Sequence, residues 1–209
     1  QLWGHVEDVY RTGMHPALQV CVRHENEIVL NRAIGHASGN APADSPSAPK
    51  RKIDLDTPIN IFSASKAVTA MLVHKLAWDG VLHLDDWVSD YIPEFALHGK
   101  ERITLRHVLA HRAGLPNLPP AALDLDLLGD PEKVVEILCD AELQSRPGRI
   151  LAYHAITGGF VLGAVIERAT GKDLREVLRK EIAEPLGLKW FNYGVAPDQI
   201  GEVAENAAT

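Results

Sequence analysis

The sequence predicts a fold with two parts. One is an α/β part, with an antiparallel sheet and flanking helices, and the other is an all-α subdomain. Two short runs, Leu18–Arg23 and Glu27–Ile34, are rich in strand-forming residues and are separated by the turn-like Glu25–Asn26, which is typical of a β-hairpin. After Phe62, apolar residues recur at helical spacing along most of the chain. The 209 residues, 46% hydrophobic and 23% charged, suffice for one large domain or two small ones.

Capping and helix-ending residues divide the helical part into separate elements. Thr104, Asp130 and Asp173 stand where N-caps are expected, and Gly171 follows a very apolar helix as its end signal. The helices expected on these grounds are Leu2–Arg11, Ala64–Trp78, Asp85–Tyr91, Thr104–His111, Pro131–Ala141, Ala155–Ala169 and a last one from Asp173 to just before Pro185. Residues 36–52 are small, proline-rich and finally basic, so we expect an exposed loop there.

The predicted strands are too few for a complete sheet. A single hairpin is only marginally stable in water. Either the N-terminal helix covers its apolar face, or further strands come from a segment absent from this chain, and we favour the second explanation. We therefore expect residues 1–62 to form the N-terminal part of the α/β subdomain and residues 63–209 the mainly helical subdomain, with the C-terminal strands of the sheet not present.

The composition excludes some classes of protein. The net charge of −7 and the pI near 5.8 argue against a general nucleic-acid binder. An apolar run of about 18 residues does not occur, so we predict no membrane span, and since no leader is visible we expect a cytoplasmic location. Cys21 and Cys139 are too few for a disulfide framework and are interpreted as buried thiols in a reducing compartment.

A serine and a lysine open the first helix after the hairpin. If this helix begins at Ser63, Lys66 lies on the same face, and the positive end of the helix dipole favours negative charge on the serine. A neutral lysine amine could take the hydroxyl proton and make Ser63 a nucleophile. Alternatively Ser63 only caps the helix and Lys66 extends to water. The same spacing occurs in Ser47 and Lys50, inside the proline-rich loop, where it carries no such meaning.

Two further patterns have structural explanations. His107 and His111 are spaced to bind zinc, but Val108 replaces the glutamate of the metalloprotease motif and a third ligand is not obvious. We expect these histidines to cap and pack a helix end, and we expect no metal ion or other cofactor. Close helix packing explains the helical glycines better than a phosphate-binding loop does: Gly158, Gly159 and Gly163.

Tyr153 stands between a turn and the apolar helix. It is either a surface aromatic residue or a phenol that relays a proton beside Ser63 and Lys66. The sequence lacks a Gly-x-Ser-x-Gly nucleophile elbow, which argues against an α/β-hydrolase.

In their order along the chain, these motifs resemble the serine β-lactamase and penicillin-binding protein superfamily. The resemblance is to its class C β-lactamase-like branch, which includes esterases, transesterases and D-amino-acid peptidases. Ser63–Lys66 is similar to the family's Ser-x-x-Lys, and Ile103–Pro116 to its "His-Thr-Ser-Gly-Leu-Pro" region. Leu76–Asp86 and Tyr91–Phe95 are similar to the segment that connects them. The resemblance implies a β-lactamase/transpeptidase-like fold.

The resemblance also implies an acyl-enzyme mechanism. Ser63 would attack an ester or amide carbonyl, with Lys66 as proton acceptor and Tyr153 as the second acid/base group. The Ser63 backbone N–H would be half of an oxyanion hole. The family's third motif, Lys/His/Trp-x-Gly on the strand that provides the other donor, is not found here. A C-terminal segment or a second chain is therefore expected to complete the site.

One departure bears on the substrate. The family's Tyr-x-Asn is replaced by Tyr153-His154-Ala155, and loss of this asparagine resembles the esterase members. We therefore expect hydrolysis of small esters, with His154 either contacting the substrate or only starting the helix. The alternatives are a weak β-lactamase or D-amino-acid peptidase of the same superfamily, and a non-catalytic partner or inactive relic.

Overall fold

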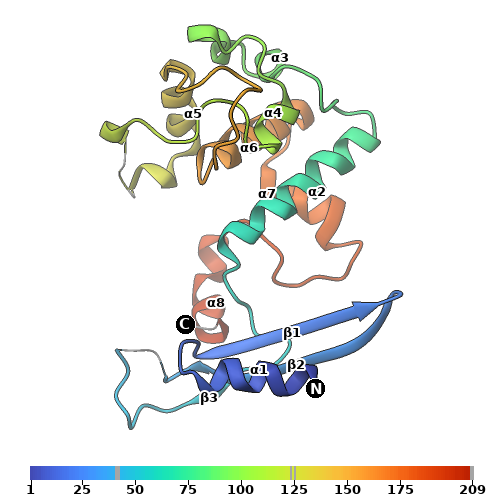
Figure 1. Ribbon diagram of the computed structural model, residues 1–209, viewed down its shortest axis with the longest axis vertical. Coiled ribbons are helices and arrows are strands. Elements are labelled where there is room, and N and C mark those ends of the chain that lie inside the picture. Colours follow the sequence, from blue (N-terminus) through green and yellow to red (C-terminus); the bar gives the residue numbers. More distant parts are fainter. Residues whose placement is uncertain (41–42, 123, 125, 208–209) are drawn as a thin grey trace. The chain divides into compact units, whose positions relative to one another are not determined.

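The computed structural model describes residues 1–40, 43–122, 124 and 126–207 (Figure 1). The chain divides into two compact units, one made of Gln1–Ile61 with Gly194–Thr209 and the other of Phe62–Tyr193. The division after Ile61 lies one residue before the boundary expected from the sequence. Gly194–Thr209 belongs to the first unit, whereas the sequence predicts it in the helical subdomain.

The first unit is built on a three-stranded antiparallel sheet with strand order β1-β2-β3. The predicted hairpin and the N-terminal helix are confirmed. Glu25 and Asn26 connect β1 to β2 with φ of 48° and 67°, the left-handed conformations that a tight hairpin turn requires. The elements of this unit are α1 (Leu2–Arg11), β1 (Ala17–His24), β2 (Glu27–Ser38), β3 (Arg51–Lys52), a 3-10 turn (Pro197–Gln199) and α8 (Ile200–Asn206).

Two expectations for this unit are wrong. The segment expected to be a loop over residues 36–52 includes the end of β2 and all of β3, because His36 and Ser38 pair with Lys52 and Arg51. Residues 41–42 of that segment lie outside the described residues. Cys21 in β1 is exposed, whereas Cys139 of the helical unit is buried as expected. Both are free thiols.

Contacts with α1 fix one face of the hairpin. The Arg32 guanidinium of β2 lies 4.5 Å from the centre of the Trp3 ring of α1. Gly35, with φ of 102°, passes so near Pro16 and Tyr10 that a Cβ atom there would come within 3.0 Å of both. The N-terminal helix therefore covers part of the hairpin. This agrees with the explanation in which the helix, rather than further strands, covers the apolar face.

The second unit is helical and contains the main hydrophobic core. Its central helices α2, α5 and α6 contribute Leu72, Leu138 and Ile166, all of which are inaccessible to solvent. Its α-helices are α2 (Ser65–Trp78), α3 (Val88–Tyr91), α4 (Leu105–Leu109), α5 (Pro131–Asp140), α6 (Thr157–Thr170) and α7 (Leu174–Leu178). Shorter turns are Phe62–Ala64, Pro93–Gly99, Pro120–Ala122 and Asp126–Gly129, and a π-helical turn, Arg179–Ala183, continues α7.

The predicted caps of this unit are confirmed. Thr104 accepts the His107 N–H, and Asp130 accepts the Lys133 N–H at the start of α5. The helix expected over Asp85–Tyr91 is shorter than predicted, since α3 begins only at Val88. Trp87 is extended and forms a bridge with Thr104, so the residues before Val88 belong to a turn.

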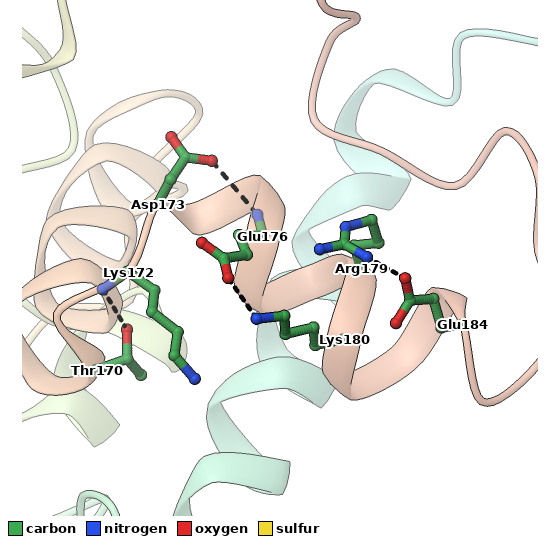
Figure 2. A network of polar contacts seen from close by, with 7 residues as sticks. All are labelled: Thr170, Lys172, Asp173, Glu176, Arg179, Lys180 and Glu184. Carbon is green, nitrogen blue, oxygen red and sulfur yellow. Dashed lines mark hydrogen bonds and ion pairs between the residues drawn. The ribbon is translucent and has the colours of Figure 1, made fainter.

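Polar side chains hold the junction of α6 with α7 (Figure 2). Asp173 caps α7 by accepting the N–H groups of Arg175 and Glu176 at 2.9 and 3.3 Å. Along the next turns Lys180 pairs with Glu176 and Arg179 pairs with Glu184. Exposed pairs of this kind contribute little individually. The cap is therefore what defines the start of α7.

Within the part of the chain that the structure describes, none of the helices has the length and apolar character needed to cross a bilayer.

Candidate active site

The structure brings Ser63, Lys66 and Tyr153 together. Ser63 lies in the 3-10 turn that leads into α2, and Lys66 lies in the first turn of that helix. Lys66 Nζ donates a hydrogen bond to Ser63 Oγ at 3.3 Å. Tyr153 Oη, 90 residues further along the chain, donates to the same oxygen at 2.7 Å. Two groups that can transfer protons therefore meet at one hydroxyl.

The surroundings of Tyr153 lower the pKa of its phenol. A hydrogen bond that Ser63 can donate to the phenolate oxygen, and then the interaction with Lys66, lower the pKa of the Tyr153 phenol below its ordinary value. Lys66 Nζ also lies 5.0 Å from the centre of the Tyr153 ring. Because a nearby cation stabilises the charged form of an acid, Tyr153 loses its proton more readily than a free tyrosine does.

His154 does not fit the predicted contact with a substrate. Its side chain is only 1% exposed. Nδ1 lies 2.6 Å from the Ala152 carbonyl oxygen, and Nε2 accepts the Leu115 N–H at 3.3 Å. A neutral ring with its proton on Nδ1 satisfies both contacts, and burial lowers the pKa of the imidazole. Both nitrogens are thus occupied inside the fold, and His154 supports the loop that carries Tyr153.

A cavity of about 1090 Å³ opens beside Ser63 in the helical unit. Thr69 and Tyr193 line it and are joined through their hydroxyls at 2.7 Å. Gly159 of α6 also lines it, and a Cβ atom on Gly159 would meet none of the described atoms within 4 Å. The volume is large enough for a small organic substrate.

The expectation of close helix packing holds for two of the three glycines. Cβ atoms built on Gly158 and Gly163 would lie 3.5 Å from Val108 and 3.2 Å from Leu174. Gly159 and Gly163 both line the cavity, but only at Gly159 would a Cβ atom meet none of the described atoms within 4 Å, so Gly159 does not serve close helix packing.

The two histidines weighed as zinc ligands bind backbone groups. His107 Nδ1 accepts the Thr104 N–H at 3.2 Å, and His111 Nδ1 accepts the His154 N–H at 3.1 Å. Among the described residues, groups of three or more side chains able to hold a metal ion are not found. The place of His111 beside Tyr153 is a feature that the sequence analysis missed, although His111 lies within the Ile103–Pro116 segment that it compared with known motifs.

The β-lactamase family model matches residues 6–209. The chain belongs to the β-lactamase family. The chain is similar to the esterase/β-lactamase LipL of Mycobacterium tuberculosis, with 40% identity over 149 residues that cover 69% of this chain and 33% of LipL. The esterase EstB of Burkholderia gladioli is 32% identical over 189 residues, covering 83% of this chain and 45% of EstB.

Solved structures confirm the predicted fold. A family VIII carboxylesterase superposes with a TM-score of 0.83 at 27% identity, over 97% of this chain and 52% of that one. A penicillin-binding protein homologue from Caulobacter crescentus gives a TM-score of 0.77 at 27% identity, over 98% of this chain and 53% of that one. The chain thus spans between a third and about half of the length of these four relatives.

Proposed function

We propose that this chain carries the nucleophile and the proton-transfer groups of a serine hydrolase that cleaves small carboxylic esters. The observation that carries the proposal is the pair of hydrogen bonds from Lys66 and Tyr153 to Ser63 Oγ. A serine hydroxyl is a weak nucleophile until a neighbouring base accepts its proton. Lys66 and Tyr153 are both within hydrogen-bond reach of that oxygen. We assign the serine proton to Tyr153, whereas the family resemblance assigns it to Lys66.

The proposed reaction has two halves. Ser63 Oγ forms a bond with the ester carbonyl carbon while its proton passes to the Tyr153 phenolate, which the Lys66 ammonium stabilises. The bond to the alcohol then breaks, and the alcohol leaves with the proton from Tyr153. Water attacks the acyl group in the same way, releases the carboxylic acid and restores the Ser63 hydroxyl.

The residue after His154 favours esters over amides. Ala155 is exposed and lines the cavity, where its methyl group has no donor or acceptor to hold an amide. The names of the relatives EstB and family VIII carboxylesterase agree with this preference. Turnover of a p-nitrophenyl ester, compared with turnover of a chromogenic cephalosporin, separates an esterase from a β-lactamase.

An oxyanion hole usually presents more than one donor, and the Ser63 backbone N–H is our candidate for one of them. Because this chain spans only part of the length of its relatives, we propose that a further segment or a second chain supplies the other donor. Intact mass of the purified active protein, with chain separation under denaturing conditions, tests for that segment.

Acylation of Ser63 is the direct test. The protein is exposed briefly to a p-nitrophenyl ester, and the acyl adduct is located by peptide mass mapping. We expect Ser63→Ala to abolish the adduct and Tyr153→Phe to slow acylation by about 10²–10⁴-fold. Ser47→Ala is the matched control, since Ser47 has a lysine at the same spacing but is exposed in a turn of the other unit.

Two results would refute the proposal. An adduct that forms equally fast on Ser63→Ala would place the nucleophile elsewhere. Complete inertness of the whole protein towards activated esters and cephalosporins would favour the non-catalytic alternative.

A further inference from the structure

His111 contacts the chain on both sides of Tyr153. Its backbone carbonyl oxygen accepts the Ala152 N–H at 3.0 Å. Its side-chain Nδ1 accepts the His154 N–H at 3.1 Å. Ala152 and His154 are the residues immediately before and after Tyr153, so a single residue holds the tyrosine backbone at two points.

The ring of His111 also contacts the Tyr153 side chain. The two ring centres are 5.0 Å apart and the planes are inclined by 60°. A ring pair of this geometry is favourable and restricts how the phenol can turn. The contacts of His111 therefore fix both the backbone and the ring whose hydroxyl reaches Ser63.

The conformation of His111 is unusual for a residue with a side chain. Its φ is 57°, in the left-handed region, where glycine, asparagine, aspartate and histidine are found more often than other residues. Glycine at this position would keep the backbone contact to Ala152 but lose the acceptor for His154. Asparagine would tolerate the same φ and place an acceptor oxygen near the position of Nδ1.

We propose that His111 is a positioning residue that holds Tyr153 against Ser63, and that it does so only as the neutral imidazole. The inference rests on the proposed function, because it assigns His111 a task in that same site. In the neutral ring, Nδ1 carries the lone pair that receives the His154 N–H, and the proton is on Nε2. Protonation of Nδ1 removes this acceptor and breaks the contact.

Burial and the neighbouring charge favour the neutral form of His111. The charge of Lys66, from α2, acts on His111, and the rings of Tyr153 and His154, from their loop, have centres 5.0 and 5.7 Å from its ring. Arg112 and His107 are titratable residues of its own segment. Arg112 directs its guanidinium towards the Gly148 carbonyl oxygen, and His107 binds the Thr104 N–H. Burial and then the charge of Lys66 lower the pKa of His111 below its ordinary value.

The sign of the pH effect follows from this direction. Since the folded-state pKa of His111 lies below the ordinary histidine value of about 6.5, the residue is neutral at pH 7 and the contact is intact. Activity is lost as the pH falls through the folded-state pKa. Stability is lost over the same acidic range, beginning near the pKa of the unfolded chain, because the unfolded state binds the proton more tightly.

The test compares His111→Asn with His111→Gly in the protein that carries the whole active site. The readouts are kcat and KM for a p-nitrophenyl ester as a function of pH. We expect His111→Gly to lower kcat by about 10–100-fold with little change in KM, because a misplaced catalytic group slows the chemical step. We expect His111→Asn to stay within about fivefold of wild type at pH 7 and to lose the acidic decline that His111 causes. His74→Asn, at an exposed site on α2, is the control and keeps the wild-type profile.

A second readout does not depend on ester turnover. Ultraviolet difference titration against Tyr153→Phe measures the pKa of Tyr153 directly. Because His111→Gly releases the phenol from Ser63 and Lys66, the pKa of Tyr153 should rise towards its ordinary value, whereas in His111→Asn it should stay low. This measurement distinguishes a failure of the inference from a failure of the proposed function.

Several results would overturn the inference. Wild-type kcat and an unchanged Tyr153 pKa in His111→Gly would show that Tyr153 is held without His111. Equal impairment of the two variants would show that the acceptor atom is not what matters. If His111→Gly does not fold, the pH profile of His111→Asn decides: an acidic decline identical to wild type contradicts the protonation step.

Discussion

Gly114 allows the segment after α4 to lie against the chain before Tyr153. It is buried, has φ of 85°, and its carbonyl oxygen accepts the Gln144 N–H at 2.9 Å. A Cβ atom at Gly114 would lie closer than 3.0 Å to the Ser145 carbonyl oxygen and 3.2 Å from Leu143 Cδ2. Replacing Gly114 with alanine should therefore destabilise the helical unit for two separate reasons.

The size of the effect follows from adding the two terms. A non-glycine residue in the left-handed region costs about 1–2 kcal/mol. Forcing a buried backbone oxygen away from a new methyl group costs about 1–3 kcal/mol more, as in other overpacked interiors. Gly114→Ala should thus lower the free energy of unfolding by about 2–5 kcal/mol, a large fraction of the stability of a typical domain.

Gly80→Ala is the matched control. Gly80 has a similar φ of 73°, but a Cβ atom there would meet none of the described atoms within 4 Å. It should cost only the first term, about 1–2 kcal/mol. Urea unfolding followed by far-ultraviolet circular dichroism gives both free energies, provided that the two variants have the same m value.

Equal losses in Gly114→Ala and Gly80→Ala would refute the reasoning, because the close approach to Ser145 would then cost nothing. We also expect a functional difference between the two variants. Leu115, the next residue, donates its N–H to His154, so displacement of this segment should reduce ester turnover in Gly114→Ala but not in Gly80→Ala.

Three other predictions concern the core, a helix cap and the electrostatics of the site. Leu138→Ala, at an inaccessible core position, should lower the free energy of unfolding by about 2–5 kcal/mol, whereas Leu151→Ala, at an exposed site, should change it by less than about 0.5 kcal/mol in urea titrations. Asp173→Ala should cost about 0.5–2 kcal/mol by removing the cap of α7, and Asp173→Asn should recover most of this loss in the same titration. Lys66→Met should raise the pKa of Tyr153 because it removes a positive charge beside the phenol, and ultraviolet difference titration checks the direction.

Local features of the sequence were enough to predict most elements and the family. The hairpin turn at Glu25–Asn26, the caps Thr104 and Asp173, and the helix that begins beside Ser63 depend on residues that are close together in the chain. The periodicity of apolar residues and the preferences of capping residues act over one or two turns of a helix. The elements that depend on them can therefore be predicted from short stretches of sequence.

The tertiary structure decided what distant residues do. Sequence alone left Tyr153 as either a surface aromatic or a neighbour of Ser63, and only the fold places its hydroxyl 2.7 Å from Ser63 Oγ. Likewise the burial of His154, the exposure of Cys21 and the position of His111 beside Tyr153 depend on how separate segments pack. Contacts across tens of residues have no local periodicity to reveal them, because they arise when independent elements are brought together by burial of their apolar faces.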